Sequence, residues 1–409
     1  MSGVELHDYP AQRDVACPFE PPPEYTASLP QRPVIEVTLW NGAHAWLVTG
    51  YQEGRLILGH PGVSSRPDLP GYPHVSPARA GYRTSSLQTF NNKDNPQHNV
   101  ERRMFTKWFT VRRINSMRAR IEQIVDDALD SLARDGSPAD LVERFAVPVP
   151  SQVIFSMLNA SYDHHSWIQH KTNAMLSWRS SQEESLAAAG ELLDFCQALL
   201  AERAANLRED DMLSAAIREH VSTGLCTLEQ LAEATRLLFA AGHETTANSI
   251  ALGTLALIDN PEQRRLIEKN TDPEFIANAV DEILRFVSIA QSGRCRVAMD
   301  DIEIADQKIK AGDGIVVSSE AANRDGRIFD CPEILDLSRS NAKEHAGFGH
   351  GTHRCLGETL AEAELQIVFK ALFTRFKGLR VAVDRGQLRF KSDHTVYGLY
   401  EFPVAWDAA

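Results

Sequence analysis

The feature that most constrains the fold is a long, uninterrupted helical pattern in the middle of the chain. Thr227 and Gln230 have the spacing of a capping box, and an apolar periodic run continues from them to Asn260, where Pro261 ends it. A helix over residues 227–260 would span roughly 50 Å at about 1.5 Å per residue. That length crosses a domain of this size, so we expect a central helix with other elements packed around it.

Patterns on both sides of this helix predict a mainly α protein with small β-sheets. Apolar residues recur at three- and four-residue steps over 99–132 and 183–208, which is typical of amphipathic helices. Strand-like runs flank Asn41-Gly42, a dipeptide that favours a tight hairpin turn. Short alternating runs over 294–317 predict further strands, and helical periodicity resumes at Leu356.

No internal repeat or linker divides the sequence, so we expect one domain over residues 1–409. Residues 1–16 are expected to form a flexible N-terminus. The proline-rich residues 17–25 predict an extended strap, because proline fixes φ and lacks a backbone donor. Residues 60–86 are rich in Gly, Pro and Ser and are expected to be mostly irregular.

Composition excludes several classes of protein. The hydrophobic content of 43% and charged content of 24% are those of a folded globular chain. The net charge of −13 disfavours nucleic acid and anionic lipid as partners. The N-terminus lacks an apolar core of the kind found in signal peptides, and no stretch of eighteen apolar residues occurs. We therefore expect a cytoplasmic protein without a membrane span.

Six cysteines are scattered without a paired spacing, and only Cys355 has unusual neighbours. It follows the segment Phe-Gly-His-Gly-Thr-His-Arg and opens a helical pattern. A thiolate at a helix N-terminus is stabilised by the dipole and by free backbone N–H groups, which suits it to bind a metal. A buried structural cysteine and a nucleophilic cysteine are the alternatives, and the second lacks an evident paired base.

The motif F-G-x-G-x-H-x-C-x-G resembles the signature of the cytochrome P-450 family, the haem-thiolate monooxygenases, here of the soluble bacterial type. The resemblance implies the fold of that family, with a long helix over haem b. It also implies that Cys355 is the axial iron ligand and that His353 reaches a haem propionate. It implies that Phe348 and Gly349 shield the sulfur of Cys355, and that Gly357 and Ala361 allow the helix to pack closely on the haem.

Other segments agree with this resemblance. Glu282 and Arg285 match the E-x-x-R pair of the family, and Arg339 resembles the third member of the same buried network, with a structural role. The resemblance also suggests three residues for the haem propionates. His98 and Arg102, one helical turn apart, match H-x-x-x-R, and Arg296 opens the strand R-x-x-x-x-D-x-E, with Arg294 as a rival candidate.

The middle of the central helix carries Ala241-Gly242-His243-Glu244-Thr245-Thr246. Glycine and threonine weaken a helix locally. The segment resembles the family motif A-G-x-[D/E]-T-T, where the helix opens beside the iron, and Ala241 is expected to face the haem. Glu244 and Thr245 fit an acid and a hydroxyl that relay protons to bound oxygen. An exposed carboxylate and a satisfied mid-helix hydroxyl are the alternatives.

The resemblance predicts a monooxygenase that inserts one oxygen atom from O2 and receives electrons from a ferredoxin and its reductase. A basic face on a monomeric enzyme would receive the ferredoxin. This face is formed by Arg102, Arg103, Lys107, Arg112 and Arg113. A solvated basic face is the alternative. The competing functions are an NADH-dependent nitric-oxide reductase of the same fold and a non-catalytic haem sensor or carrier.

The substrate pocket of the family is lined by variable segments, so only positions can be suggested. The candidates are apolar, which favours a medium or large hydrophobic molecule over a charged metabolite, with hydroxylation in secondary metabolism as the expected role. The positions are Leu237, Ala240, Ile289, Ala290 and Val396, the last in an expected closing strand. Several of them fit equally well as core residues. The type of oxidation cannot be deduced from them.

Overall fold

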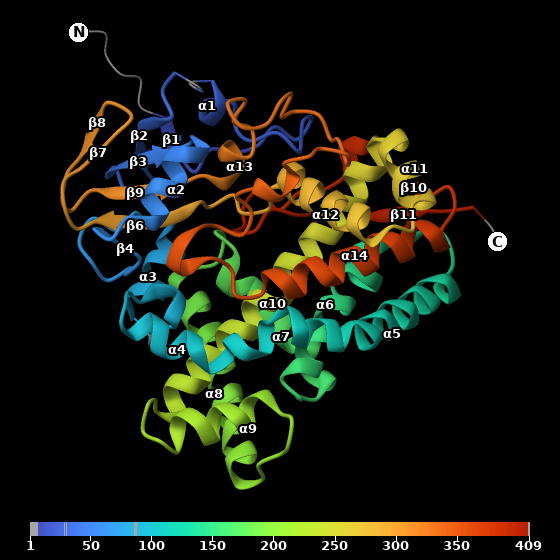
Figure 1. The fold of residues 1–409 in the computed structure, drawn as a ribbon, viewed down its shortest axis with the longest axis horizontal. Helices are drawn as coiled ribbons and strands as arrows, with labels where there is room; N and C mark the ends of the chain where they lie inside the picture. Colours follow the sequence, from blue (N-terminus) through green and yellow to red (C-terminus); the bar gives the residue numbers. More distant parts are fainter. Residues whose placement is uncertain (1–6, 28, 30, 86–87, 408–409) are drawn as a thin grey trace.

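The computed structural model describes residues 7–27, 29, 31–85 and 88–407. Figure 1 shows a helical body with the main β-sheet at one corner, beside the N-terminal segment. The central helix runs through the middle of the body, and α14 lies close to it. The expectation of a mainly α protein with small sheets is therefore confirmed.

The helices occupy most of the chain from residue 97 to residue 375. The α-helices are α1 (Pro23–Thr26), α2 (Tyr51–Gly59), α3 (Pro77–Ser85), α4 (Gln97–Thr106), α5 (Val111–Asp135), α6 (Pro148–Met157), α7 (His165–Leu176), α8 (Gln182–Ala205), α9 (Met212–Ala216), α10 (Leu228–Asp259), α11 (Pro261–Lys269), α12 (Pro273–Val287), α13 (Ser319–Ala322) and α14 (Glu358–Arg375). Short π-helical turns are η3 (Val142–Ala146) and η5 (Ile217–Val221). Short 3₁₀ turns are η1 (Phe90–Asn92), η2 (Lys107–Phe109), η4 (Tyr162–His164), η6 (Ala342–Glu344), η7 (Gly351–His353) and η8 (Arg385–Gln387).

The central helix is α10, within one residue of the expected limits at each end. The Thr227 hydroxyl accepts a hydrogen bond from the Gln230 backbone N–H at 3.1 Å, and the Gln230 side chain accepts one from the Thr227 N–H at 2.9 Å. This capping box satisfies two donors that a helix start otherwise leaves free. Pro261 then begins α11, so the chain turns where the sequence predicts. Helices α6, α8, α12 and α14 pack against α10.

The strands form three small sheets among the described residues. The largest has the order β1-β2-β3-β9-β6-β4, and the others are β10-β11-β5 and the hairpin β7-β8. The expected hairpin at Asn41-Gly42 is present, with Val34 paired to Val48 in an antiparallel register and Gly42 at φ +79°. The strands are β1 (His7–Tyr9), β2 (Val34–Leu39), β3 (His44–Val48), β4 (Val63–Ser64), β5 (Ala139–Asp140), β6 (Arg294–Ala298), β7 (Ile302–Ile304), β8 (Gln307–Ile309), β9 (Gly314–Val317), β10 (Arg380–Val381) and β11 (Pro403–Ala405).

The structure differs from the sequence-based expectations at the N-terminus. Residues 7–16 are not a flexible end, because His7–Tyr9 pair with β2 and the Arg13 side chain is buried in an ion pair with Glu320. The expected extended strap includes a helical turn at Pro23–Thr26, where proline suits the first turn of a helix. Residues 1–6 of the expected flexible segment lie outside the described residues.

Two other expectations also need correction, whereas a third holds. The described part of the segment 60–86 is mostly irregular, as expected, and its longest regular element is helix α3, which packs against α8. The expected helix over 99–132 is divided by the 3₁₀ turn Lys107–Phe109, which buries Trp108 and Phe109. Val396 does not lie in a strand, because the closing segment pairs only through an isolated bridge before β11.

None of the helices in the described part of the chain combines the length and the apolar character needed to cross a lipid bilayer.

Candidate active site

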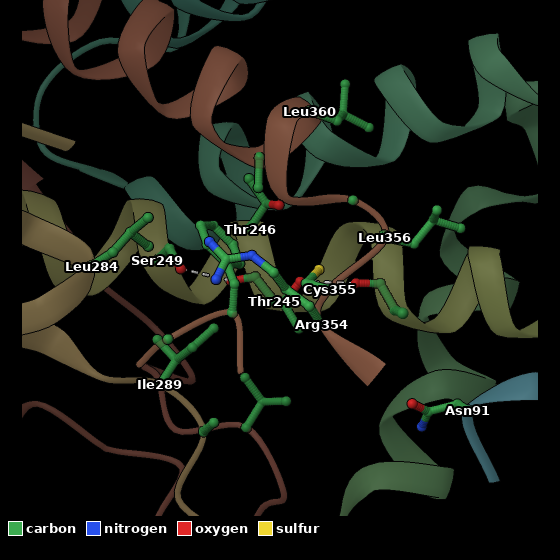
Figure 2. A pocket seen from close by; sticks show the side chains of 18 of the residues that line it. Asn91, Thr245, Thr246, Ser249, Leu284, Ile289, Arg354, Cys355, Leu356 and Leu360 are labelled. Atoms are coloured by element: carbon green, nitrogen blue, oxygen red, sulfur yellow. Dashed lines mark hydrogen bonds between the residues drawn. The ribbon is translucent and has the colours of Figure 1, made fainter. Parts of the chain in front are cut away.

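A cavity of about 350 Å³ lies between α10 and the segment that carries Cys355. Figure 2 shows Thr245, Thr246 and Ser249 from α10 on one side and Arg354, Cys355 and Leu356 on the other. Segments far apart in the chain therefore meet at one site. The parts of the chain that supply its lining are residues 90–109, Ile154, residues 237–249, residues 284–294, Ser319, residues 345–365 and residues 395–396.

Cys355 is the single cysteine among the residues that line this cavity. Its side chain is accessible from the cavity, yet it lies deep inside the protein. Burial raises the pKa of the Cys355 thiol, and a hydrogen bond from the Gly357 backbone partly opposes this effect. The sequence predicts a lowered pKa from the helix terminus, but α14 begins only at Glu358. Burial outweighs the dipole, so a thiolate here needs a cation to compensate its charge.

The loop before Cys355 is fixed by its backbone. The Cys355 N–H donates to the Phe348 carbonyl oxygen at 2.9 Å, and Phe348 lines the cavity beside the sulfur. Gly349 adopts φ +75°, and a Cβ atom there would lie 2.7 Å from the Arg294 side chain. Gly349 is therefore needed both for the turn and for close packing, although it does not itself line the cavity.

Two histidines with incompletely satisfied rings lie at the edge of the cavity. The rings of His98 and His353 are in contact, with centroids 4.3 Å apart. His98 Nε2, His353 Nδ1 and the Trp108 indole N–H are buried without a hydrogen-bond partner among the described residues. The other ring nitrogen of His353 lies 3.1 Å from the Ser65 hydroxyl, which also contacts Asp94. The contact with Ser65 holds the His353 ring in place. The three atoms without a partner among the described residues can therefore hydrogen-bond to a bound group.

Arginine side chains supply positive charge around the same edge. Arg102 lines the cavity, and burial lowers its pKa while the charge of Cys355 acts in the opposite direction. Arg294 also lines it, donates to the Gly347 carbonyl oxygen at 2.6 Å and contacts Ser319. Burial lowers the pKa of Arg294 to about 10. Arg296 is buried and its charge acts on His353, but it does not line the cavity. Arg294, the alternative candidate for the haem propionate, does line it.

The α10 side of the cavity carries the expected hydroxyl. Thr245 lines the cavity and donates its hydroxyl to the Ala241 carbonyl oxygen at 2.8 Å, while Ser249 donates to the Thr245 carbonyl oxygen at 3.0 Å. In two consecutive turns of α10, a backbone carbonyl oxygen therefore accepts a hydrogen bond from a side-chain hydroxyl. Ala241 and Gly242 line the same stretch, so only small side chains separate the helix backbone from the cavity.

Glu244 faces away from the cavity in this conformation. Its side chain is fully buried, and its Oε1 atom accepts hydrogen bonds from Lys391 Nζ at 2.6 Å and Asn248 Nδ2 at 3.0 Å. Burial is the largest single effect and would raise its pKa, but the charge and hydrogen bond of Lys391 together with the charges of His243 and His394 outweigh it, and the pKa of Glu244 is lowered to about 2. Glu244 is therefore a carboxylate, adjacent to Thr245 in sequence but not among the lining residues.

Four of the five apolar positions suggested for substrate do line the cavity: Leu237, Ile289, Ala290 and Val396. Ala240 does not, because it lies about 100° around α10 from Ala241, which takes its place. The structure adds lining residues that the sequence analysis missed, including Phe90, Asn91, Ile154, Leu284, Ser292 and Thr395. They come from loops and neighbouring helices and carry no local motif. Lys391 was missed as well, because its contact with Glu244 spans 147 residues of sequence.

Comparisons with known proteins agree with this geometry. Residues 37–391 match the family model described as cytochrome P-450. The chain is 40% identical over 400 residues to cytochrome P-450 GfsF of Streptomyces halstedii, covering 98% of this chain and 96% of that protein. It is 39% identical to the 20-oxo-5-O-mycaminosyltylactone 23-monooxygenase of Streptomyces fradiae, covering 95% and 90%. The structure of the mycinamicin VIII C21 methyl hydroxylase MycCI from Micromonospora griseorubida, bound to mycinamicin VIII, superposes with a TM-score of 0.91 at 33% identity, covering 98% and 100%.

The chain belongs to the cytochrome P-450 family. It is a monooxygenase that incorporates one oxygen atom into an organic substrate, and its cofactor is an iron-containing haem. The residues of this P-450 fit that cofactor. The sulfur of Cys355 would supply the iron ligand. The polar atoms of His98, Trp108 and His353 without a partner among the described residues, together with the cations Arg102 and Arg294, would suit the two haem carboxylates. Gly357 and Ala361 place small residues in the cavity wall where α14 begins, beside Leu360.

A second cluster of charges supports the site from outside the cavity. Glu282 accepts hydrogen bonds from Arg285 at 2.7 and 2.8 Å, from Arg339 at 3.0 Å and from the Asp336 backbone at 3.0 Å. Arg285 also donates to the backbone carbonyl oxygens of residues 323, 332 and 334. The three charged residues therefore tie α12 to the segment that leads into the cysteine loop of this P-450.

Proposed function

We propose that this P-450 oxidises a medium or large hydrophobic compound of secondary metabolism. The observation that carries the proposal is the apolar character of the cavity beside Thr245, where Leu237, Ile289, Ala290 and Val396 lie together. A charged substrate would lose its hydration beside these apolar side chains, which is unfavourable, and the lining cations Arg102 and Arg294 are suited to the haem carboxylates instead. Polar side chains at Asn91 and Ser292 provide a few groups that can orient such a molecule.

The related enzymes support a large substrate. The name of the 23-monooxygenase describes a glycosylated lactone, and the hydroxylase MycCI is bound to mycinamicin VIII. These two compounds are therefore suitable first probes for this chain. The cavity draws its lining from six different segments and from Ser319, so its shape depends largely on parts of the chain outside the cysteine motif.

We propose that Thr245 and Glu244 relay the protons that the reaction consumes. When bound, haem iron supplies the activation of O2. Thr245 fits the role of the hydroxyl that donates a proton to bound oxygen. Its hydroxyl lines the cavity and can turn from the Ala241 carbonyl oxygen toward a ligand. Glu244 fits the proton source, because a buried carboxylate adjacent to Thr245 can carry a proton after a side-chain rotation that breaks the pair with Lys391.

We propose an external ferredoxin, with its reductase, as the electron donor. The basic face of α4 and α5 supports this partner: Arg103 and Arg112 are exposed, while Lys107 and Arg113 pair with Glu219 and Asp210. An acidic ferredoxin would be attracted to the exposed pair. Arg112→Glu is expected to reduce the rate of electron transfer from an acidic ferredoxin about tenfold at low salt, with Arg32→Glu, beside β2, as control. Equal rates for both variants would contradict the docking face.

We further propose that the cofactor is haem b and that the enzyme is a monomer built as one domain in the cytoplasm. Haem b is not attached covalently, and Cys355 is the single cysteine lining the described cavity. One hydrophobic cluster connects buried residues from Phe90 to Val404, which supports a single domain.

The substrate proposal is tested by optical titration of the purified ferric protein with mycinamicin VIII, the 20-oxo lactone and a charged amino acid. A shift of the haem Soret band from the low-spin to the high-spin position reports displacement of water from the iron. We expect saturable shifts with at least one of the two large compounds and none with the amino acid. A shift with the amino acid alone would contradict a hydrophobic substrate.

A further inference from the structure

One arginine of the N-terminal segment reaches the interior of the protein. Arg13 lies between β1 and α1, and its side chain is only 1% exposed. Its guanidinium donates to Glu320 Oε2 from Nε at 3.0 Å and from Nη2 at 2.6 Å, and the Glu320 side chain is 2% exposed. Burying and ordering a guanidinium is costly, so a buried arginine with so distant a partner in the sequence requires an explanation.

The remaining N–H groups of Arg13 bind the backbone where α12 ends. Nη1 donates to the Val287 carbonyl oxygen at 3.3 Å, and Nη2 donates to the Ser288 carbonyl oxygen at 2.5 Å. A further bond from Nη1 reaches the Pro18 carbonyl oxygen at 3.4 Å, so the bonds of Arg13 match the five N–H groups of a guanidinium. A helix end leaves its last carbonyl oxygens without partners, and arginine is suited to bind them.

The carbonyl groups that Arg13 binds belong to the substrate side of the cavity. Val287 and Ser288 line the cavity, and so do the next two residues, Ala290 and Ile289, the latter labelled in Figure 2. Ser288 adopts φ +39°, a left-handed conformation that is strained for a residue with a side chain. The bonds of Arg13 therefore hold the turn from which Ile289 and Ala290 enter the wall, although Arg13 itself does not line the cavity.

Arg13 also contacts the C-terminal segment of the chain. Its guanidinium carbon lies 4.3 Å from the centre of the Tyr397 ring, within the range of a cation–π interaction. Tyr397 is 1% exposed, and its backbone N–H donates to the Ile289 carbonyl oxygen at 2.8 Å. The two residues before it, Thr395 and Val396, line the cavity. One side chain thus connects the two segments of the wall that this backbone bond joins.

We propose that Arg13 is a positioning residue that sets the shape of the substrate side of the cavity from outside it. The proposal rests on the hydrophobic substrate of the proposed function and names a residue that decides which compounds fit. A rigid guanidinium fixes the distances between Glu320, the end of α12 and the Tyr397 ring. Residues of a binding site recognise a ligand well when supporting contacts hold them within about 0.5 Å. Compounds that fill the cavity should therefore depend on Arg13, and ligands that only reach the iron should not.

The first test depends neither on activity nor on the identity of the substrate. Hydrogen exchange of the haem-loaded enzyme, followed by mass spectrometry, reports how well the backbone of each segment is held. The double variant Arg13→Met/Glu320→Gln removes both buried charges together. We expect exchange in residues 286–292 and 394–398 to become about tenfold faster in this variant. Unchanged exchange in both segments would overturn the proposal.

The matched control changes a second buried pair of the same kind. Arg203 pairs with Asp211, both side chains are 1% exposed, and Arg203 also donates to the Asn159 carbonyl oxygen at 3.0 Å. None of these three residues lines the described cavity. Arg203→Met/Asp211→Asn should leave exchange in the two wall segments unchanged. If it speeds exchange there as much as the Arg13 variant does, the effect is a general loss of stability and the proposal is wrong.

The second test compares imidazole with 4-phenylimidazole, which both bind haem iron through a ring nitrogen. The shift of the Soret band gives the dissociation constant of each ligand, and their ratio measures what the phenyl group gains from the cavity wall. In the unmutated enzyme, an apolar wall should make 4-phenylimidazole bind about tenfold more tightly or better. The Arg13 variant should lose about fivefold of this gain, with its affinity for imidazole within about twofold of normal. The Arg203 variant should keep the gain.

The outcomes separate this proposal from the function on which it rests. If 4-phenylimidazole binds no more tightly than imidazole to the unmutated enzyme, the hydrophobic cavity itself is contradicted. If the gain is present and the Arg13 variant keeps it in full, Arg13 has no positioning role and the hydrophobic cavity stands. Where the double variant does not retain haem, Arg13→Lys takes its place. It keeps the charge beside Glu320 but has three donors instead of five, so it should still lose part of the gain, and full retention would again contradict the proposal.

Discussion

Glu282 on α12 and Glu244 on α10 are both fully buried carboxylates paired with a cation, but their surroundings differ. Both oxygens of Glu282 accept hydrogen bonds, and its partners Arg285 and Arg339 are themselves bonded to several backbone carbonyl oxygens. Glu244 has one oxygen bonded and one free, and its partner Lys391 is a flexible side chain. The fully hydrogen-bonded network of Glu282 holds its side chains in one arrangement. Glu244, with only one bonded oxygen, can take up a proton and change its rotamer.

The comparison separates a structural use of buried charge from a reactive one. The Glu282 network joins α12 to residues 323–339, just before the cysteine loop, and no member of it lines the cavity. The Glu244 pair adjoins Thr245, and the second oxygen of Glu244 has no partner among the described residues. The first cluster should therefore control stability and haem retention. The second should control proton supply with a smaller effect on stability.

The largest expected effect comes from Glu282→Ala. Removing the carboxylate leaves Arg285 and Arg339 buried with fewer partners, and breaking a buried pair in this way costs about 3–5 kcal/mol of the free energy of unfolding. We expect low yields of haem-containing protein, measured by Soret absorbance per polypeptide and by urea unfolding. The matched control is Glu262→Ala, which breaks an exposed pair of the same spacing with Arg265 and should cost under about 1 kcal/mol. Similar losses for both variants would contradict the structural role of the network.

Acid should weaken the Glu244 pair by a smaller amount. Its pKa is lowered to about 2, below the value of about 4.3 for an unfolded chain. A carboxyl with a depressed pKa stabilises the fold above its unfolded pKa, and this contribution disappears as the pH falls from about 5 to 2. At roughly 1.4 kcal/mol per pKa unit the contribution is about 3 kcal/mol. The unfolding free energies of the unmutated protein and Glu244→Gln should therefore approach each other as the pH falls from about 5 to 2. A constant difference would contradict the depressed pKa.

Lys391→Met should have a smaller effect and reverse the direction of this pH dependence. Without the cation, burial dominates, so the pKa of Glu244 rises and the side chain can become a neutral acid. Taking up a proton avoids a buried unpaired charge, so we expect a loss of about 2 kcal/mol at pH 7, less than for Glu282→Ala. The loss should shrink as the pH falls toward 5. Urea unfolding at several pH values measures it, and a loss that grows in acid would contradict the interpretation.

The sequence predicted one of these two regions better than the other. Glu282 and Arg285 are three residues apart on one helix, so their pairing follows from helix geometry, and the family motif added Arg339. The central helix was also predictable, because its cap, its periodicity and Pro261 are local signals. Lys391 could not be found in this way, because its pairing with Glu244 depends on where the C-terminal segment packs against α10.

In the cavity, too, the residues of a local motif were predictable, and the residues brought together by packing were not. Phe348, His353, Cys355 and Gly357 lie within one motif around a turn that requires glycine, and Ala361 follows four residues later in α14. The substrate side is assembled from loops and from different helices, and sequence analysis found only some of its residues. Ala241 lines the cavity and Ala240 does not, because the lining face of α10 depends on how the helix is rotated in the fold.

Thr245→Ala should have the smallest effect on stability and a large effect on coupling. The Thr245 hydroxyl donates one hydrogen bond to a carbonyl oxygen that α10 already uses, so its loss should cost less than about 1 kcal/mol. The hydroxyl nevertheless lines the cavity, next to the residue that carries the proton. We expect NADPH oxidation to continue while a larger share of electrons appears as peroxide, measured with mycinamicin VIII and without substrate. Thr245→Ser, which keeps the hydroxyl, should preserve coupling. If Thr245→Ala couples as well as the unmutated enzyme, Glu244 must deliver protons by another route, and the contrast with Glu282 would then rest on Glu244 and Lys391 alone.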